Sequence, residues 1–125
     1  MDNCIFCKII NNEIPSKKIY EDDDVIVILD LHPACDGHSL IIPKKHITDM
    51  LDMDNETINK VWEVSKKLTP ILMDKMNANA LSLRVNYGAS QEIKHFHMHL
   101  LPNYQYKKPS MSQDEAYEVL KDVTI

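Results

Sequence analysis

The spacing of apolar and polar residues changes along the chain and predicts where strands lie. Residues 25–29 (VIVIL) are apolar at every position, which is typical of a central strand covered on both faces of a sheet. Residues 38–43 (HSLIIP) form a second predicted strand, which the final proline ends. Residues 80–87 (ALSLRVNY) and 94–102 (KHFHMHLLP) alternate between apolar and polar side chains, so each is expected to be a strand with one apolar face.

Helical spacing takes over from residue 54 to about residue 76. Asp54 or Asn55 is the expected cap. The apolar residues then fall near one stripe of a helix: Ile58, Val61, Trp62, Leu68, Leu72 and Met76. Pro70 lies inside this stretch and is expected to bend or split the helix near Thr69, because proline removes a backbone donor and its ring clashes with the preceding turn.

Two short helices are expected near the ends of the chain. Residues 4–15 (CIFCKIINNEIP) predict a short helical turn that stops before Pro15. Ser112 followed by Glu115 predicts a capping box that starts a terminal helix. The order of elements predicts an α+β fold: a central antiparallel sheet of about five strands with one long helix and short terminal helices.

Composition limits the size, location and partners of the protein. A chain of 125 residues is expected to form a single domain, residues 1–125. Its longest apolar run, residues 25–29, is far too short to cross a bilayer, and its first residues lack the pattern of a secretory signal. We therefore expect a cytoplasmic location and no membrane partner. The formal net charge of −5 comes with no obvious basic face, so no nucleic-acid partner is expected.

Three of the six histidines, His95, His97 and His99, alternate with apolar residues over five positions. In a strand they would project from one face at intervals of roughly 6.6 Å. They could be an exposed polar face, although three imidazoles in register repel one another when protonated. They could bind a metal, since imidazole suits zinc, copper and iron. They could also catalyse phosphoryl transfer, with a neutral histidine as the nucleophile.

The segment HFHMHLL fits the pattern His-apolar-His-apolar-His-apolar-apolar and resembles the histidine triad superfamily. The resemblance runs from about Cys4 to Pro102 and includes CIFCKIINNEIPSKKIYEDDDVIVILDLHP, GHSLIIPKKH and LRVNYGASQ. It is closest to the branch of purine nucleoside phosphoramidate hydrolases. The resemblance implies a homodimer formed by the long helix and a neighbouring strand, where Trp62 and Met76 could lie, although burial in the core would explain both equally well.

The resemblance also implies a role for each histidine. His97 would be the nucleophile that takes the nucleoside 5′-phosphoryl group, and water would then release the nucleoside monophosphate. His99 would contact the α-phosphate and help to protonate the leaving group, and His95 would help to set the geometry of the site. His38, in the segment DGHSLIIP, would support the strand of the nucleophile.

Five further residues are implied to bind the nucleoside. Asp30 would accept hydrogen bonds from both ribose hydroxyls, and Asn86 would bond the phosphate or the leaving group. Phe6, Ile9 and Ile28 would form an apolar wall for the base.

The phosphate site is expected to differ from glycine-rich loops. The chain has only two glycines, Gly37 and Gly88, which excludes a P-loop or a dinucleotide fingerprint. Phosphate would meet imidazoles, Asn86 and the backbone amides of the stretch Ser90, Gln91 and Glu92. This loop is shorter and poorer in glycine than in the phosphoramidate hydrolases that it resembles, and the position of Glu92 commonly holds a small or hydroxyl residue. An inward carboxylate would repel a long polyphosphate, and a Glu92 side chain that points to solvent is the equal alternative.

The cysteines raise the question of zinc. Cys4 and Cys7 form a C-x-x-C pair that suits one zinc ion, although a redox pair is the rival interpretation. The resemblance implies that His46 and His95 complete four ligands. A closed set of two cysteines and two histidines would hold a structural Zn²⁺, with no organic cofactor implied. Cys35 is left as a small residue in a turn.

The leading hypothesis is a hydrolase of purine nucleoside 5′-phosphoramidates. Hydrolysis of dinucleoside polyphosphates by the same histidines is the nearest rival, which HLLP and Lys94 favour and Asp30 disfavours. A nucleotide-binding module without turnover is the alternative from another class, although binding alone requires no nucleophile.

Overall fold

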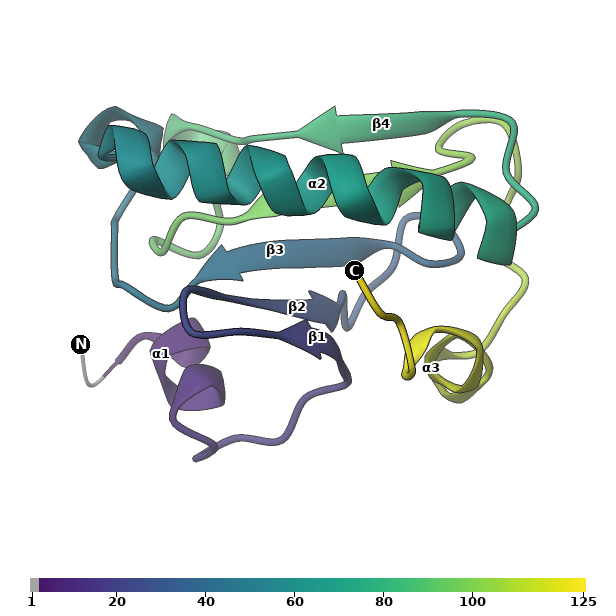
Figure 1. Cartoon of the computed structure of the whole chain (residues 1–125), viewed down its shortest axis with the longest axis horizontal. Coiled ribbons are helices and arrows are strands. Elements are labelled where there is room, and N and C mark those ends of the chain that lie inside the picture. The colour runs from purple at the N-terminus through teal and green to yellow at the C-terminus, as the bar shows by residue number, and fades with distance from the viewer. Residues whose placement is uncertain (1–2) are drawn as a thin grey trace.

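The computed structural model describes residues 3–125 and is built on one five-stranded antiparallel sheet (Figure 1). Met1 and Asp2 begin both the predicted domain and the segment predicted to lack a secretory signal, and they lie outside the described residues. The strands are β1 (Lys18–Glu21), β2 (Val25–Leu29), β3 (Ser39–Pro43), β4 (Leu81–Arg84) and β5 (Met98–Pro102), in the spatial order β1-β2-β3-β5-β4. The helices are α1 (Ile5–Ile10), α2 (Asn55–Lys75) and α3 (Gln113–Leu120).

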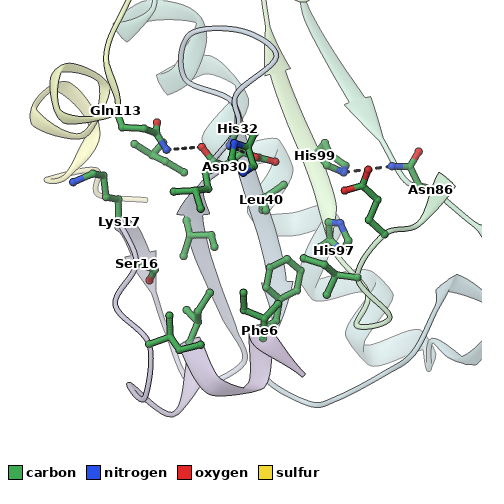
Figure 2. A pocket seen from close by; sticks show the side chains of 18 of the residues that line it. Phe6, Ser16, Lys17, Asp30, His32, Leu40, Asn86, His97, His99 and Gln113 are labelled. Atoms are coloured by element: carbon green, nitrogen blue, oxygen red, sulfur yellow. Dashed lines mark hydrogen bonds between the residues drawn. The ribbon is translucent and has the colours of Figure 1, made fainter. Parts of the chain in front are cut away.

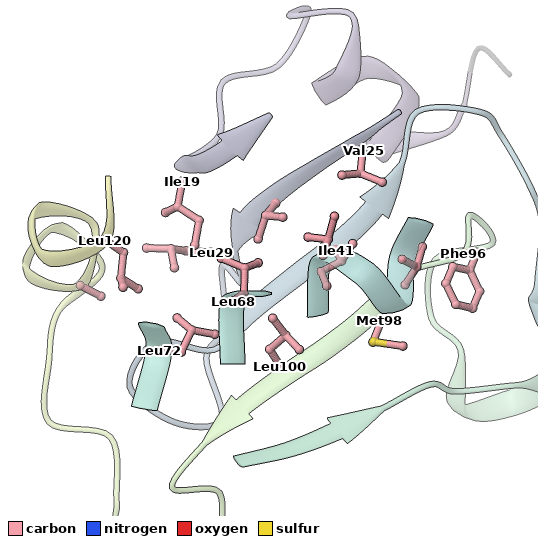
Figure 3. Close-up of a cluster of buried hydrophobic side chains, with 14 of the residues drawn as sticks. Ile19, Val25, Leu29, Ile41, Leu68, Leu72, Phe96, Met98, Leu100 and Leu120 are labelled. Atoms are coloured by element: carbon pink, nitrogen blue, oxygen red, sulfur yellow. The ribbon is translucent and has the colours of Figure 1, made fainter. Parts of the chain in front are cut away.

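Helices cover both faces of the sheet, which confirms the predicted α+β architecture. The long helix α2 lies along one face, and the larger apolar cluster fills the space beneath it (Figures 1 and 3). The short helix α1 covers the other face at the β2–β3 side, with Phe6 and Ile9 in a second cluster. Strand β2 supplies both clusters: Val25, Val27 and Leu29 pack into the first, whereas Ile26 and Ile28 pack into the second.

The predicted caps are present. Asp54 caps α2 by accepting a hydrogen bond from the backbone N–H of Thr57 at 3.1 Å. Ser112 and Glu115 form the expected capping box at the start of α3. Ahead of α3, the Asp36 carboxylate accepts hydrogen bonds from the backbone N–H groups of Ser110 and Met111, both at 2.9 Å. These contacts tie the C-terminal segment to the loop between β2 and β3.

Pro70 does not split α2, which corrects one expectation from the sequence. The helix runs continuously from Asn55 to Lys75. Pro70 and Lys66 are both exposed, so the Lys66 carbonyl that loses its helical donor can be hydrated. Leu68 and Leu72 on the opposite side are fully buried and hold the helix against the sheet.

Two strands also differ from expectation. Strand β1 was missed because only Ile19 in it is buried, leaving little periodic signal. The apolar side chains of β4 are less buried than its alternation predicts: Leu83 is 38% exposed because β4 is an edge strand. Trp62 in α2 is also half exposed, whereas Met76 is buried in the core.

The histidine segment is only partly a strand. Strand β5 begins at Met98, and the bend at residues 93–95 precedes it. Pairing ends here because the last partner on β3 is Ile41, opposite Met98, and the last on β4 is Arg84, opposite His99. Phe96 and Met98 still enter the core beneath α2, as the alternation predicts.

Gly37 is packed tightly at the turn before β3. It has a φ of +80°, and a β-carbon there would lie 2.7 Å from Cγ of Met76. We expect Gly37→Ala to lower the free energy of unfolding by about 2–3 kcal/mol, through strain in the left-handed region and overpacking together. Urea denaturation measures this change.

Gly88→Ala is the matched control. Gly88 has a φ of +73° but no heavy atom within 4 Å of the added carbon, so only the strain of about 1 kcal/mol is expected. Equal losses in the two variants would contradict a role for the contact with Met76.

Candidate active site

A cavity of about 790 Å³ opens on the face of the sheet that carries α1. Apolar side chains line one part of it: Phe6, Ile9, Ile14, Ile28 and Leu40. Figure 2 shows His97 and His99 toward the side where Asn86 lies, with Lys17 and Gln113 on the opposite side. A volume of this size is in the range of sites that hold small organic ligands.

The backbone determines which nitrogen of His97 carries its proton. Nδ1 of His97 lies 2.9 Å from the carbonyl oxygen of His95, which can only accept, so Nδ1–H is the donor. Nε2 therefore carries the lone pair. The ring also packs edge-on against Phe6, with centroids 5.0 Å apart. His97 lines the cavity with a neutral imidazole that is suited to act as a nucleophile.

A second chain of hydrogen bonds orients His99. The backbone N–H of Ala34 donates to Nδ1 of His38 at 3.0 Å, so a neutral His38 carries its proton on Nε2. That Nε2–H lies 2.8 Å from Nδ1 of His99, which must then accept. The proton of His99 is consequently on Nε2, on the side of Asn86, whose Nδ2 lies 3.5 Å away. Because the nitrogen and oxygen of an amide are interchangeable in assignment, the Asn86 oxygen suits this contact better.

Burial keeps these rings neutral at neutral pH. It lowers the pKa of His97 and of His38 below the ordinary value. Burial, reinforced by His97 and His38, lowers the pKa of His99 to about 4. The nearby Asp30 carboxylate acts in the opposite direction on all three rings but is the smaller influence. The lone pair of His97 is therefore available without prior deprotonation.

Asp30 lies at the end of β2, on the cavity wall. Its Oδ1 accepts a hydrogen bond from the backbone N–H of His32 at 2.8 Å, and its Oδ2 lies 3.4 Å from Nε2 of His38. Its carbonyl oxygen accepts a hydrogen bond from Nε2 of Gln113 in α3. Both carboxylate oxygens of Asp30 therefore have a partner in the protein, and each can still accept a further hydrogen bond from a ligand in the cavity.

Some side chains of the loop after β4 line the cavity, and another stabilises the loop itself. Asn86, Ser90 and Glu92 line the cavity, as predicted for phosphate contacts. Gln91 does not: its side chain is buried, and its amide donates to the carbonyl oxygens of Thr48 at 2.7 Å and Ile93 at 3.1 Å. The Gln91 side chain therefore holds the loop in place through these hydrogen bonds and does not line the cavity.

His95 is turned away from the cavity into a cluster with Cys4, Cys7 and His46, the four residues that the sequence groups as metal ligands. Its Nε2–H donates to the carbonyl of Pro43 at 2.7 Å, so Nδ1 carries the lone pair. That Nδ1 lies 3.4 Å from Sγ of Cys4 and 3.5 Å from Sγ of Cys7. The His95 side chain lies in this cluster, and its backbone carbonyl is its link to His97.

The cavity residues that were missed from the sequence include Lys17, Arg84 and Gln113. Arg84 had a weak signal, because it alternates with Asn86 and so shares its face of the strand. Lys17 and Gln113 had none, since they reach the cavity only when α3 packs beside β1. Lys17 is paired there with Asp114 at 2.9 Å.

Comparison with known proteins gives a consistent result. The model of the HIT domain matches residues 11–106. An uncharacterized HIT-like protein of Borreliella burgdorferi is 41% identical over 110 residues, which cover 84% of this chain and 78% of that protein. The adenosine 5′-monophosphoramidase HNT1 of Saccharomyces cerevisiae is 38% identical over 106 residues, which cover 83% of this chain and 65% of that enzyme.

A solved structure agrees over nearly the whole chain. The Zn-bound histidine triad family protein from Mycobacterium smegmatis superposes with a TM-score of 0.87 at 28% identity, covering 96% of this chain and 91% of that chain.

Fold, cavity and histidines together define a nucleotide-binding, hydrolase-like protein of the α+β class. The chain belongs to the HIT (histidine triad) family, as the match over most of its length shows. Among residues 3–125, no helix is long and apolar enough to span a membrane.

Proposed function

We propose that the protein hydrolyses purine nucleoside 5′-phosphoramidates through a covalent nucleotidyl intermediate on His97. The observation that carries this proposal is the bare Nε2 of a buried, neutral imidazole in a cavity that also holds an apolar wall and a carboxylate. Base, ribose and phosphate would contact the apolar wall, Asp30 and the histidines in turn. The 38% identity to an adenosine 5′-monophosphoramidase supports the same substrate class.

The chemistry would proceed in two displacements. His97 Nε2 attacks phosphorus, the bond from phosphorus to nitrogen breaks, and the amine departs with a proton taken from solvent. The carbonyl of His95 stabilises the positive ring that forms, through the Nδ1–H bond. His99 supports the step by donating Nε2–H to the phosphoryl oxygens or the departing nitrogen. Water then attacks the intermediate, which releases the nucleoside monophosphate and restores His97.

The test is release of adenosine monophosphate from adenosine 5′-phosphoramidate, with diadenosine tetraphosphate assayed in parallel. Faster turnover of the phosphoramidate would support the proposal. Preference for the tetraphosphate would keep the histidine chemistry but assign the protein to polyphosphate hydrolysis. Tight nucleotide binding with no turnover of either compound would favour a binding module.

We also propose that Cys4, Cys7, His46 and His95 bind a structural Zn²⁺. Each residue offers one ligand atom, and the four atoms lie within 4.8 Å of one another. The set of two thiolates and two imidazoles is one that zinc prefers, and four protein ligands leave no open position for substrate. Bound there, the ion would hold α1 against the segment that carries His97. The zinc bound by the Mycobacterium smegmatis relative supports this assignment.

A homodimer is the proposed assembly. Trp62 is 50% exposed, and both Leu83 of the edge strand β4 and Val85 just after that strand are more than one third exposed. Burial of this apolar surface against a second copy would stabilise the pair. Light scattering should then give twice the chain mass of 14.5 kDa. A single domain over residues 1–125 and a cytoplasmic location stay predictions from the sequence.

A further inference from the structure

The cavity wall around Asn86 carries a carboxylate that forms no ion pair with any residue from 3 to 125. Glu92 lines the cavity there together with Asn86 and Ser90. Among residues 3–125, no Lys, Arg or His nitrogen lies within 4.0 Å of its carboxylate. Lys94, two residues further along, donates instead to the carbonyl of Gly88 at 2.9 Å and is outside the lining.

The loop holds Glu92 at this position. The preceding residue, Gln91, is anchored by its two hydrogen bonds to Thr48 and Ile93 and is only 4% exposed. Its backbone is extended, and its N–H donates to Gly88 at 3.0 Å. With Gln91 fixed on the protein side, the next side chain is directed to the cavity side. The Glu92 side chain therefore lines the cavity while the residue remains exposed to solvent.

The other charged side chains of the cavity are Asp30, Arg84 and Lys17, and Asp30 is assigned to the ribose. Arg84, opposite His99 in the register of β4 and β5, is the cation on the phosphate side, and its guanidinium lies 4.7 Å from the ring of Tyr104. Its single positive charge balances a phosphoryl monoanion. Lys17 belongs to the opposite side and is paired with Asp114. With a substrate phosphate in place beside Arg84, no other cation of the cavity lining on that side balances the charge of Glu92.

We propose that Glu92 selects substrates whose leaving group carries a positive charge, such as an alkylammonium a few bonds from the scissile nitrogen. This inference rests on the proposed phosphoramidate hydrolysis and specifies its leaving group. A cation beside Glu92 gains Coulomb attraction, whereas an anionic chain is repelled. Because the carboxylate is exposed, the attraction falls as salt screens it.

Three adenosine 5′-phosphoramidates of matched length test the inference, with amines that end in an ammonium, a methyl or a carboxylate group. For the wild-type protein, kcat/KM is expected to be about tenfold higher for the ammonium than for the methyl compound, and lowest for the carboxylate. Glu92→Gln should bring the ratio of ammonium to methyl close to one. Glu92→Lys should reverse the order of ammonium and carboxylate. Glu63→Gln, a surface change in α2 next to Lys67, is the matched control and should leave the ratio unchanged.

Two results would overturn the inference while leaving phosphoramidate hydrolysis in place. One is equal kcat/KM for the three compounds in the wild-type protein. The other is a preference for the ammonium compound that Glu92→Gln and Glu92→Lys leave intact, which would place the selecting group elsewhere. Failure to hydrolyse any of the three would instead reject the proposed function itself, and the inference with it.

Discussion

His97→Ala is expected to lower kcat for phosphoramidate hydrolysis by a factor of about a thousand or more while leaving the fold in place. The substitution removes the imidazole whose Nε2 lone pair would attack phosphorus. The hydrogen bond from Nδ1 to the His95 carbonyl and the packing against Phe6 hold that ring in the cavity. Without it no covalent intermediate can form, and direct attack by water must use the remaining groups alone. His99 cannot substitute, because its Nδ1 is engaged by His38 and its Nε2 carries the proton.

The measurement is single-turnover kinetics with a nucleotide label, together with the intact mass of the acid-quenched protein. Wild-type protein should show a nucleotidyl adduct, and His97→Ala should show none. His32→Ala is the matched control: this histidine is at the exposed rim of the same cavity and should keep activity within about threefold. Retention of a tenth or more of the wild-type kcat by His97→Ala would rule out the nucleophile.

Loss of the zinc cluster is expected to have the second large effect. Cys7→Ala should abolish zinc binding and lower the free energy of unfolding by about 4 kcal/mol or more, because a structural ion contributes its binding energy to folding. Burial and the neighbouring Cys4 raise the pKa of the Cys7 thiol to about 11 in the metal-free protein. Binding zinc must therefore displace a proton, so affinity for the ion should weaken as the pH falls.

Metal content by mass spectrometry and thermal unfolding with and without a chelator measure these effects. Cys35→Ala is the matched control, because Cys35 is buried outside the cluster and should leave one zinc ion per chain. A wild-type protein that contains no zinc and unfolds at the same temperature after chelation would contradict the assignment.

Local rules in the sequence were enough for much of the fold. The apolar run of β2, the Asp54 cap and the Ser112–Glu115 box depend on neighbours within a few residues, and all three are present. The predicted split of α2 at Pro70 does not occur, because Pro70 is on the side of the helix that faces solvent, where water can hydrate the carbonyl that loses its donor. The predicted start of β5 at residue 94 was wrong, because pairing partners that are distant in sequence decide where a strand begins.

The candidate site likewise contains features that the sequence predicts and features that it does not. The alternation predicts that His95, His97 and His99 share one face, but only His97 and His99 line the cavity. His95 lies before β5 begins and turns toward the cysteines, a position that the resemblance implied and the spacing did not. Gln91 and Glu92 are neighbours in a loop, where no period tells which one faces the cavity. Gln113 is 83 positions from Asp30 and meets it only through the packing of α3.

The hydrocarbon wall formed by Phe6, Ile9 and Ile28 has a consequence for the range of substrates. The side chains of this wall can contact the flat face of a base, but they carry no hydrogen-bond donor or acceptor that could distinguish the polar groups at its edge. Adenine and guanine have nearly the same breadth, and apolar contacts separate compounds this similar by factors of about 10 to 200 at most. Which purine compound the protein consumes in a cell would then follow from the concentrations it meets.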